Sequence, residues 1–325
     1  MLIKKITSIL LIVLILISIV GCSNQNSNES SQQANQTEQS EAKEISIAVI
    51  PKALDSEFWL DVKQGAEKAA EENNINLSVL APDKESNVEQ QFRIIEDMIQ
   101  KKVDALLIAP CDSAGVVPFI EKANEANIPV FTIDTNADGG DVVSFIGTDN
   151  VLGGKIAGER VIKLLNGKGK VALIVGVPGQ QTMRDRASGF KEAIATAPEI
   201  QLVAEQPANS ERALAMTVME NILQANPDLD AVFACSTLMA MGALEAVEAA
   251  GKLDQVKVIG FDSQKESLEA IKAGKLDSLV AQNPFNMGYL GVKAAIDYIN
   301  GKEVPNRIDT GTELVTIENV DKYLK

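Results

Sequence analysis

The stretch ISIAVIPKALDSEFWLDVKQGAEKAAEENNINLSVL, residues 45–80, decides the fold of this chain. An apolar, β-branched run at 45–50 opens it and a second run at 75–80 ends it. Between the two runs, apolar residues recur at helical spacing near 58–73. The stretch therefore predicts a strand, a helix and a parallel strand joined by a right-handed crossover.

The same alternation continues along the rest of the chain. Further strands are predicted at 103–110, 128–134 and 142–147, with helices near 87–101 and 115–126. The pattern then restarts, with helices near 150–166, 183–196, 211–225, 238–250 and 264–273 and strands at 171–176, 200–207, 230–236, 256–262 and 276–282. Most strands lack polar alternation, as in parallel sheets covered on both faces. The sequence thus predicts an α/β fold with two similar, doubly wound parallel-sheet domains.

Polar residues gather at or just beyond the ends of the predicted strands. In open parallel sheets, ligands bind beyond the carboxyl ends of the strands. We therefore expect these positions to line one ligand cleft between the two domains. They are Pro110, Cys111, Asp112, Asp134, Thr135, Ser236, Thr237, Asp262 and Gln282.

Composition excludes several functions. The chain of 325 residues has 30 basic and 45 acidic residues, a net charge of −15 at pH 7, which disfavours binding to nucleic acid. It has no histidine, which excludes Ser-His-Asp and Cys-His catalysis and histidine-ligated zinc. The sequence also lacks GxGxxG and EF-hand motifs. Its only glycine-lysine cluster, GKGK at 167–170, precedes a predicted strand, whereas a phosphate-binding loop follows a strand. We expect no cofactor, no metal and no catalysis.

The N-terminus is typical of an export signal. Lys4 and Lys5 precede an apolar stretch at 6–20, which is shorter than the roughly 20 residues of a membrane-spanning helix. The following Gly21-Cys22 completes a sequence that resembles the lipobox of bacterial lipoproteins. We expect a signal peptide at 1–21 and lipidation of Cys22. The alternative is an ordinary signal peptide that happens to precede a cysteine.

Residues 22–44 are expected to form a tether. This segment is rich in Ser, Asn, Gln and Glu and nearly free of apolar residues, so it predicts disorder. With Cys22 lipidated, only Cys111 and Cys235 remain, too few for a disulfide framework.

Two pairs of residues are candidates for ligand contact. Phe58 and Trp59 open the first helix, where at least one ring is positioned to stack on the C–H face of a sugar and either could instead belong to the core. Arg184 and Arg186 lie near the start of a later helix, where a cation is unfavourable without a partner. We expect one arginine to pair with a carboxylate and the other to face the cleft.

From about residue 45 to the C-terminus, the chain resembles the ribose-binding-protein branch of the type I periplasmic binding proteins. The resemblance implies two domains joined by a hinge with three crossings near Thr148, Gln282 and Thr312, and a ligand held by closure of the cleft. The N-terminal lobe would comprise 45–148 and 283–311, and the C-terminal lobe 149–282 and 312–325. The matching stretches are IAVIPKALDSEFWLDVKQGAEKAA (47–70), VDALLIAPCDS (103–113), ANIPVFTIDT (126–135), TDNVLGGKIAG (148–158), RDRASGFKEA (184–193), NPDLDAVFA (226–234), MGALEAV (241–247), VIGFD (258–262) and LVAQNP (279–284).

The resemblance also implies a set of binding residues. Three positions depart from the ribose binder: Thr135 replaces an arginine, Ser236 an asparagine and Ser210 a stacking phenylalanine. Together these departures argue against specificity for D-ribose. The loss of the stacking ring at Ser210 predicts a ligand that is smaller or more polar than one stacked between aromatic rings of both lobes. The implied ligand-binding residues are Lys52, Ser56, Phe58, Trp59, Asp134, Thr135, Arg184, Ser236, Asp262 and Gln282.

The function implied is that of a lipid-anchored, extracytoplasmic solute-binding protein. It would capture a small sugar or polyol and deliver it to the permease subunits of an ABC importer as a monomer, touching the membrane only through its lipid. The residues around Pro51-Lys52 also resemble receptors for autoinducer-2, so a sensory receptor for a sugar-like signal is the alternative. A sugar-responsive repressor shares the two-domain core but would need an N-terminal helix-turn-helix in place of the signal peptide.

Overall fold

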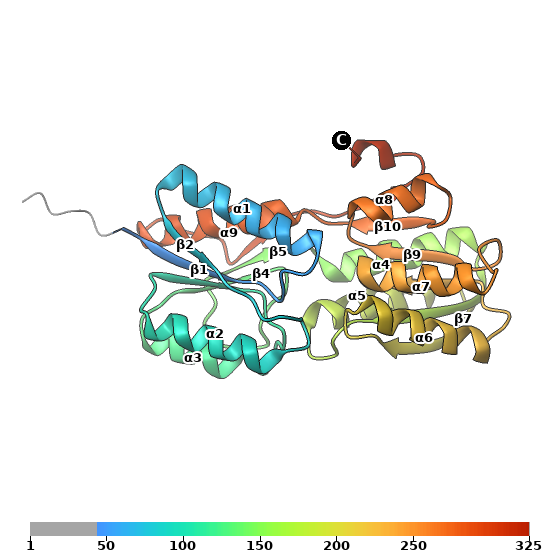
Figure 1. The fold of residues 1–325 in the computed structure, drawn as a ribbon, viewed down its shortest axis with the longest axis horizontal. Coiled ribbons are helices and arrows are strands. Elements are labelled where there is room, and N and C mark those ends of the chain that lie inside the picture. The colour runs from blue at the N-terminus through green and yellow to red at the C-terminus, as the bar shows by residue number, and fades with distance from the viewer. Residues whose placement is uncertain (1–43, 325) are drawn as a thin grey trace, which may run out of the picture. The chain divides into compact units, whose positions relative to one another are not determined.

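The computed structural model describes residues 44–324 and shows two parallel sheets flanked by helices (Figure 1). Cys22, the signal peptide and most of the tether lie outside the described residues. The first half of the chain contains β1 (Ser46–Ile50), α1 (Glu57–Asn73), β2 (Asn76–Val79), α2 (Val88–Gln100), β3 (Ala105–Ile108), α3 (Val117–Glu125), β4 (Val130–Ile133) and β5 (Ser144–Gly147).

The second half repeats this alternation and then returns to the first sheet. Its elements are α4 (Asn150–Leu164), β6 (Lys168–Val175), α5 (Gln181–Ile194), β7 (Glu199–Pro207), α6 (Arg212–Ala225), β8 (Ala231–Ala234), α7 (Thr237–Ala249), β9 (Lys257–Phe261), α8 (Lys265–Lys272), β10 (Ser278–Ala281), α9 (Pro284–Ile299), β11 (Arg307–Asp309), β12 (Glu313–Thr316) and the 3₁₀ helix η1 (Val320–Lys322). Helix α9 and the elements after it lie beyond the last strand that the sequence pattern predicted.

The strands form two six-stranded sheets, which confirms the predicted fold class. The first has the order β11-β5-β4-β3-β1-β2 and the second β12-β10-β9-β8-β6-β7. All strand pairs are parallel except β10 with β12. We call the first sheet with α1, α2, α3 and α9 the first lobe, and the second sheet with its helices the second lobe. The chain passes between the sheets after β5, after β10 and after β11.

Helices cover both faces of each sheet. In the first lobe α1 and α9 pack together on one face, and α2 and α3 lie on the other. In the second lobe α4 packs on α5, and α6 packs on α7. The inner strands β3, β4, β5 and β8 are buried along their whole length, whereas the edge strand β7 is largely exposed. Burial on both faces explains the continuous apolar runs in the sequence.

Glycines allow paired helices to approach closely in both lobes. A Cβ added to Gly288 of α9 would lie 1.9 Å from the carbonyl oxygen of Val62 in α1. In the second lobe, a Cβ on Gly189 of α5 would lie 2.0 Å from the carbonyl oxygen of Val151 in α4. Such contacts are far shorter than van der Waals distance, so only glycine fits at these crossings.

Candidate ligand-binding site

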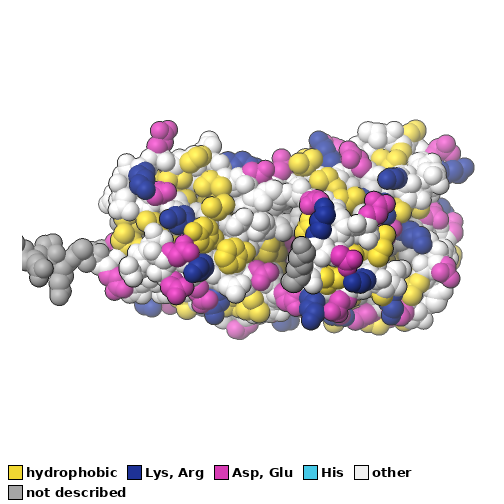
Figure 2. Space-filling view, turned by 90° about the horizontal axis from the view of Figure 1, so that it is seen from above, with side chains coloured by type: hydrophobic (Ala, Val, Ile, Leu, Met, Phe, Trp, Pro, Cys, Tyr) yellow, Lys and Arg dark blue, Asp and Glu magenta, His cyan; other side chains and the backbone are white. Residues whose placement is uncertain are grey.

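A narrow cavity lies between the lobes, where the carboxyl ends of several strands meet. Its lining comes from both lobes, as predicted for an open parallel sheet. Acidic and basic side chains are interspersed over the face of the molecule seen in Figure 2. The lining residues are Lys52, Ser56, Phe58, Trp59, Glu85, Asp134, Met183, Arg186, Ser236, Thr237, Leu238, Asp262, Gln264 and Gln282.

Two aspartates occupy equivalent places in the two lobes. Asp134 follows β4 and Asp262 follows β9, and both are almost fully buried. Each has a left-handed backbone, with φ of 59° and 73°. The amide nitrogen of each donates to the neighbouring strand, to the carbonyl of Ile146 at 2.9 Å and of Val280 at 2.8 Å. Strained backbone held by surrounding structure is concentrated at functional sites, and here it turns both carboxylates toward the cleft.

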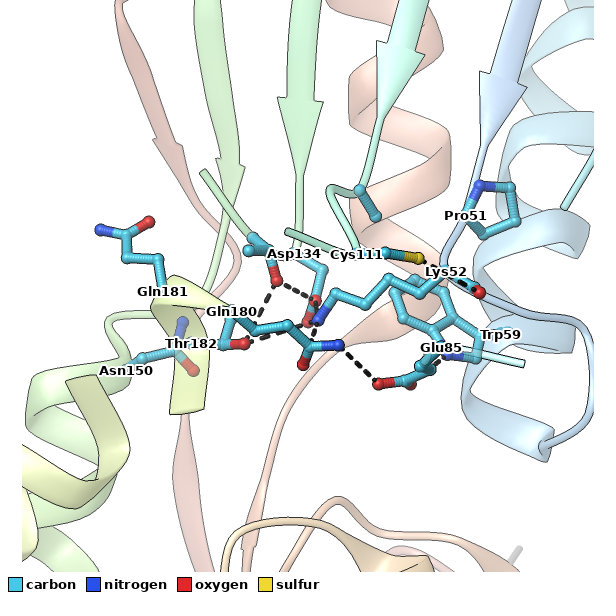
Figure 3. A network of polar contacts seen from close by, with 12 residues as sticks. Pro51, Lys52, Trp59, Glu85, Cys111, Asp134, Asn150, Gln180, Gln181 and Thr182 are labelled. Carbon is cyan, nitrogen blue, oxygen red and sulfur yellow. Dashed lines mark hydrogen bonds and ion pairs between the residues drawn. The ribbon is translucent and has the colours of Figure 1, made fainter. Parts of the chain in front are cut away.

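Asp134 is engaged by a buried lysine (Figure 3). The ammonium nitrogen of Lys52 lies 2.9 Å from Oδ2 of Asp134, and both side chains are nearly inaccessible to solvent. The hydroxyl of Thr135 donates to the same oxygen at 2.8 Å. Lys52 also donates across the cleft to Oε1 of Gln180 at 3.2 Å and to the hydroxyl of Thr182 at 3.5 Å. The lysine charge is therefore neutralised within the first lobe and hydrogen-bonded to the second.

Arg186 brings a cation to the other side of the cavity. It is 2% exposed, and its side chain lies over the ring of Phe261 with 3.7 Å between Cζ and the ring centroid. Nε donates to Oδ1 of Asn150 at 2.8 Å, and Nη1 donates to the carbonyl oxygen of Cys235 at 2.7 Å. The third nitrogen of the guanidinium, Nη2, takes no part in these two bonds. A guanidinium held so firmly is well suited to donate to hydroxyl oxygens.

Asp262 and Gln282 form a second polar pair. Nε2 of Gln282 donates to Oδ1 of Asp262 at 2.5 Å. Burial raises the pKa of Asp262, while the charge of Arg186 and the bond from Gln282 oppose that shift. Among the described residues, Oε1 of Gln282 has no hydrogen-bond partner although it is buried. An unmet buried acceptor costs about 1–3 kcal/mol, so this oxygen is placed to accept a hydrogen bond from a ligand.

Phe58 and Trp59 serve both the core and the cavity. Their rings meet edge to face, with centroids 4.9 Å apart, and both side chains are buried. Nε1 of Trp59 donates to Oε1 of Glu85 at 2.9 Å. Both residues belong to the apolar cluster between α1, α9 and the first sheet, and both also line the cavity. The two predicted roles are therefore compatible for each ring.

The structure brings most of the predicted residues to the cavity. Thr135 lies behind Asp134 as its hydrogen-bond donor rather than on the cavity wall. Arg184 lies outside it: its side chain is 44% exposed and pairs with Asp138 at 2.6 Å. The strand-end residues Pro110, Cys111 and Asp112, which were expected in the cleft, do not line this cavity. The predicted residues on the wall are Lys52, Ser56, Phe58, Trp59, Asp134, Ser236, Thr237, Asp262 and Gln282.

Arg186 takes the place that the sequence analysis gave to Arg184. Residues two apart on a helix point to nearly opposite sides, so the pair divides between cleft and exterior, as expected. Which arginine faces inward depends on how α5 is rotated against α4, where Gly189 and Gly154 meet the facing backbone. The assignment within the pair differs from the prediction for this reason.

Sequence reasoning missed other wall residues. Glu85 lies in the connection between β2 and α2, away from any strand end. Leu238 and Gln264 come from the starts of α7 and α8. Arg186 could have been found from the sequence, because one arginine of the pair Arg184 and Arg186 was expected to face the cleft. For Glu85, nothing in the local sequence pattern distinguished it from the other acidic residues between predicted strands and helices.

The two buried cysteines are unsuited to nucleophilic chemistry. Burial raises the pKa of the Cys111 thiol and raises that of Cys235 to about 12, so both are protonated at neutral pH.

Within residues 44–324, no group of acidic or cysteine side chains is arranged to hold a metal ion. No helix in that part of the chain is long and apolar enough to cross a membrane.

Comparison with known proteins gives consistent matches. The family model described as "periplasmic binding protein domain" matches residues 47–303. The ribose import binding protein RbsB of Bacillus subtilis is 40% identical over 274 residues, which are 84% of this chain and 88% of that protein.

Solved structures resemble the fold closely. A solute-binding protein of an ABC transporter from Actinobacillus succinogenes, with bound D-allose, has a TM-score of 0.81 and 34% identity, covering 86% of this chain and all of that one (100%). A carbohydrate transporter solute-binding protein from Agrobacterium radiobacter, in complex with D-arabinose, has a TM-score of 0.83 and 32% identity, covering 87% of this chain and 100% of that one.

Proposed function

Because this chain belongs to the periplasmic binding protein domain family, we propose that it captures one small sugar or polyol between its lobes and delivers it to an ABC importer. Like the relatives that it matches, it is a binding protein and not an enzyme. The sensory-receptor alternative is not favoured, since the similar proteins of known role are import binding proteins and transporter components.

One observation carries the proposal for the ligand class. The buried Oε1 of Gln282, unpaired among the described residues, lies on the same wall as the carboxylate of Asp262 and the guanidinium of Arg186. A polyol hydroxyl can donate to the amide or carboxylate oxygen while it accepts from the guanidinium. Phe58 and Trp59 add apolar surface for the C–H face of a sugar. A polyhydroxylated ligand satisfies all of these groups together.

Ligand entry requires movement of the lobes. The space between them is about 30 Å³, room for no more than a few water molecules. The connections that contain Thr148, Gln282 and Thr312 are the only covalent links between the sheets in the described chain, and we assign the hinge to them. The lobes then correspond to 45–148 with 283–311 and 149–282 with 312–325. Opening at this hinge exposes the cavity, and closure encloses the ligand.

We further propose that the protein is exported as a monomer and anchored by lipid at Cys22. The support is the charged and apolar N-terminal sequence ending in Gly21-Cys22. Expression of the full chain and of Cys22→Ala in a host that processes lipoproteins tests this. The parent should partition to the membrane fraction and the variant should not. Equal membrane retention and equal modification of both would overturn the lipid anchor.

A melting screen tests the ligand class. Pentoses, hexoses, polyols and autoinducer-2 are added singly to the purified protein, because a ligand at 100 times its dissociation constant stabilises by about 2.7 kcal/mol. At least one sugar or polyol should raise the melting temperature, and Asp262→Asn should reduce that shift. Stabilisation by autoinducer-2 alone would favour the receptor, and no stabilisation by any sugar or polyol would refute the proposal.

A further inference from the structure

A second chamber adjoins the ligand cavity. Its volume is about 220 Å³, and it shares Glu85 and Leu238 with the wall of the cavity. It lies between the β1–α1 and β2–α2 connections of the first lobe and the β7–α6 connection of the second. We call this space the side chamber. Because the two spaces have walls in common, a ligand held in the cavity can extend a substituent into the side chamber.

Ser210 gives the side chamber a hydrogen-bonding group that the protein does not use. The residue lines the chamber and is 7% exposed. Among the described residues, its hydroxyl has no hydrogen-bond partner. Ser210 stands where the resemblance to the ribose binder places a stacking phenylalanine, and the smaller side chain leaves room there. A buried hydroxyl without a partner is costly, so this position favours a ligand group that bonds to it.

Both cations that line the side chamber are already paired. Nζ of Lys84 lies 3.4 Å from Oε1 of Glu211, which comes from the opposite lobe. Arg212 donates to Glu245 and to Glu266, at 2.8 Å for the second. Neither of these two glutamates lines the chamber, so the charge of Arg212 is neutralised outside it. The pairs account for the lysine, the arginine and one carboxylate of the lining.

The carboxylates of Asp55 and Glu85 are left without a cation. Among the described residues, neither forms an ion pair with a lysine or arginine. Glu85 accepts from two uncharged donors, Nε1 of Trp59 and Nε2 of Gln180 (Figure 3). Burial raises the pKa of Asp55, and the nearby charges of Glu85 and Glu211 raise it further. A positive group in the side chamber would compensate this surplus of negative charge.

An alkylammonium group suits the side chamber better than a metal ion does. Within residues 44–324, no three acidic or cysteine side chains are placed to hold a metal ion together. An ammonium group has three N–H donors and needs only acceptors around it. The chamber supplies acceptors of two kinds, the carboxylates of Asp55 and Glu85 and the hydroxyl of Ser210.

Resting on the proposed function, which places the hydroxyl groups of the ligand in the cavity, we propose that the side chamber is a subsite for an ammonium group of the same ligand. The substrate class is then an amine-bearing sugar or polyol. The polyol part contacts Arg186, Asp262 and Gln282, and the amine contacts Asp55, Glu85 and Ser210.

The first experiment compares matched pairs of ligands by calorimetry. The pairs are D-ribitol with 1-amino-1-deoxy-D-ribitol and D-glucitol with 1-amino-1-deoxy-D-glucitol. In each pair one hydroxyl is replaced by an amine, which is protonated at pH 7 as a lysine side chain is. At least one amine should bind about tenfold more tightly than its neutral counterpart at low salt. That advantage should shrink in about 0.5 M NaCl, because salt screens partly exposed charges.

The second experiment repeats the comparison with variants of the side chamber. Asp55→Asn and Glu85→Gln each remove one charge with little change of shape, and Ser210→Ala removes the hydroxyl. Each should lower the ratio of amine to neutral affinity about threefold or more. Asp83→Asn is the matched control, since Asp83 is exposed, lies two positions before Glu85 and lines neither space. It changes the net charge equally and should leave the ratio unchanged. Thermal melting verifies that each variant is folded.

Three results would overturn the ammonium subsite. The first is equal or weaker binding of the amine in every pair. The second is an amine advantage that Asp83→Asn reduces as much as Asp55→Asn does. The third is a melting shift with calcium or magnesium chloride that Asp55→Asn abolishes, which would assign the chamber to a metal ion.

The failure of the subsite is distinguishable from the failure of the proposed function. If neutral sugars or polyols from the melting screen bind and no amine is preferred, only the subsite fails. If the protein binds neither neutral nor amine-bearing sugars and polyols, both fail.

Discussion

Replacement of Arg186 by lysine should destabilise the protein far more than the same replacement at Arg184. Arg186 is 2% exposed and makes two charged hydrogen bonds, to Asn150 and to the carbonyl of Cys235. A lysine ammonium at this site can replace only one of them. The lost bond is worth about 1.5–3 kcal/mol and the lost stacking on Phe261 about 2 kcal/mol, so Arg186→Lys should lower the free energy of unfolding by about 3.5–5 kcal/mol.

Arg184→Lys is the matched control, two positions away on the same helix. The Arg184 side chain is 44% exposed and pairs with Asp138, which is 39% exposed. Because solvent screens the two charges, such a pair contributes about 0–1 kcal/mol to stability, and lysine retains the positive charge. We expect the unfolding free energy of this variant to stay within about 1 kcal/mol of the wild type.

Urea unfolding followed by circular dichroism measures both variants, and calorimetry with the sugar found in the melting screen measures binding. Arg186→Lys should also weaken that binding, because it removes the fixed donor geometry of the guanidinium. Arg184→Lys should bind as the wild type does. Equal unfolding free energies for the two variants, or a loss of binding confined to Arg184→Lys, would refute the placement of Arg186 in the cavity.

The remaining predictions concern packing, charge and stacking. Gly288→Ala should lower the unfolding midpoint in urea, since the new methyl group meets the backbone of α1 and overpacking costs about 1–3 kcal/mol or more; an unchanged midpoint would show that α1 and α9 can separate freely. Asp262→Asn should raise the melting temperature at neutral pH while weakening sugar binding, because burial raises the pKa of Asp262 and its charged form opposes folding. That gain should shrink as the pH falls through the raised pKa toward about 4, the ordinary aspartate value, and a gain independent of pH would contradict the assignment. Phe58→Leu should keep the unfolding free energy within about 1.5 kcal/mol but weaken sugar binding measurably by calorimetry, whereas undiminished affinity would return the ring to a purely structural role.

Local sequence predicted much of the site because each strand end carries its own polar residue. Asp134, Asp262 and Gln282 directly follow β4, β9 and β10, and Ser236 lies two residues after β8. Parallel strands bring their carboxyl ends to one edge. Helix α9 was not predicted, and it packs on α1 and the first sheet rather than on β10, the strand directly before it in the chain. The close crossing of α1 and α9 depends on Gly65 and Gly288, each of which faces the backbone of the other helix, a relation between distant residues.

The sequence by itself determined the alternating α/β fold, the two sheets and the strand-end residues of the cavity. These follow from patterns within single strands and helices, where the period of apolar residues sets which faces are buried. The tertiary structure alone decided that Arg186 rather than Arg184 lines the cavity, and that Gln180 meets Lys52 and Glu85. The rotation of a helix about its axis and the meeting of two lobes depend on packing between residues far apart in the chain, which no local pattern encodes.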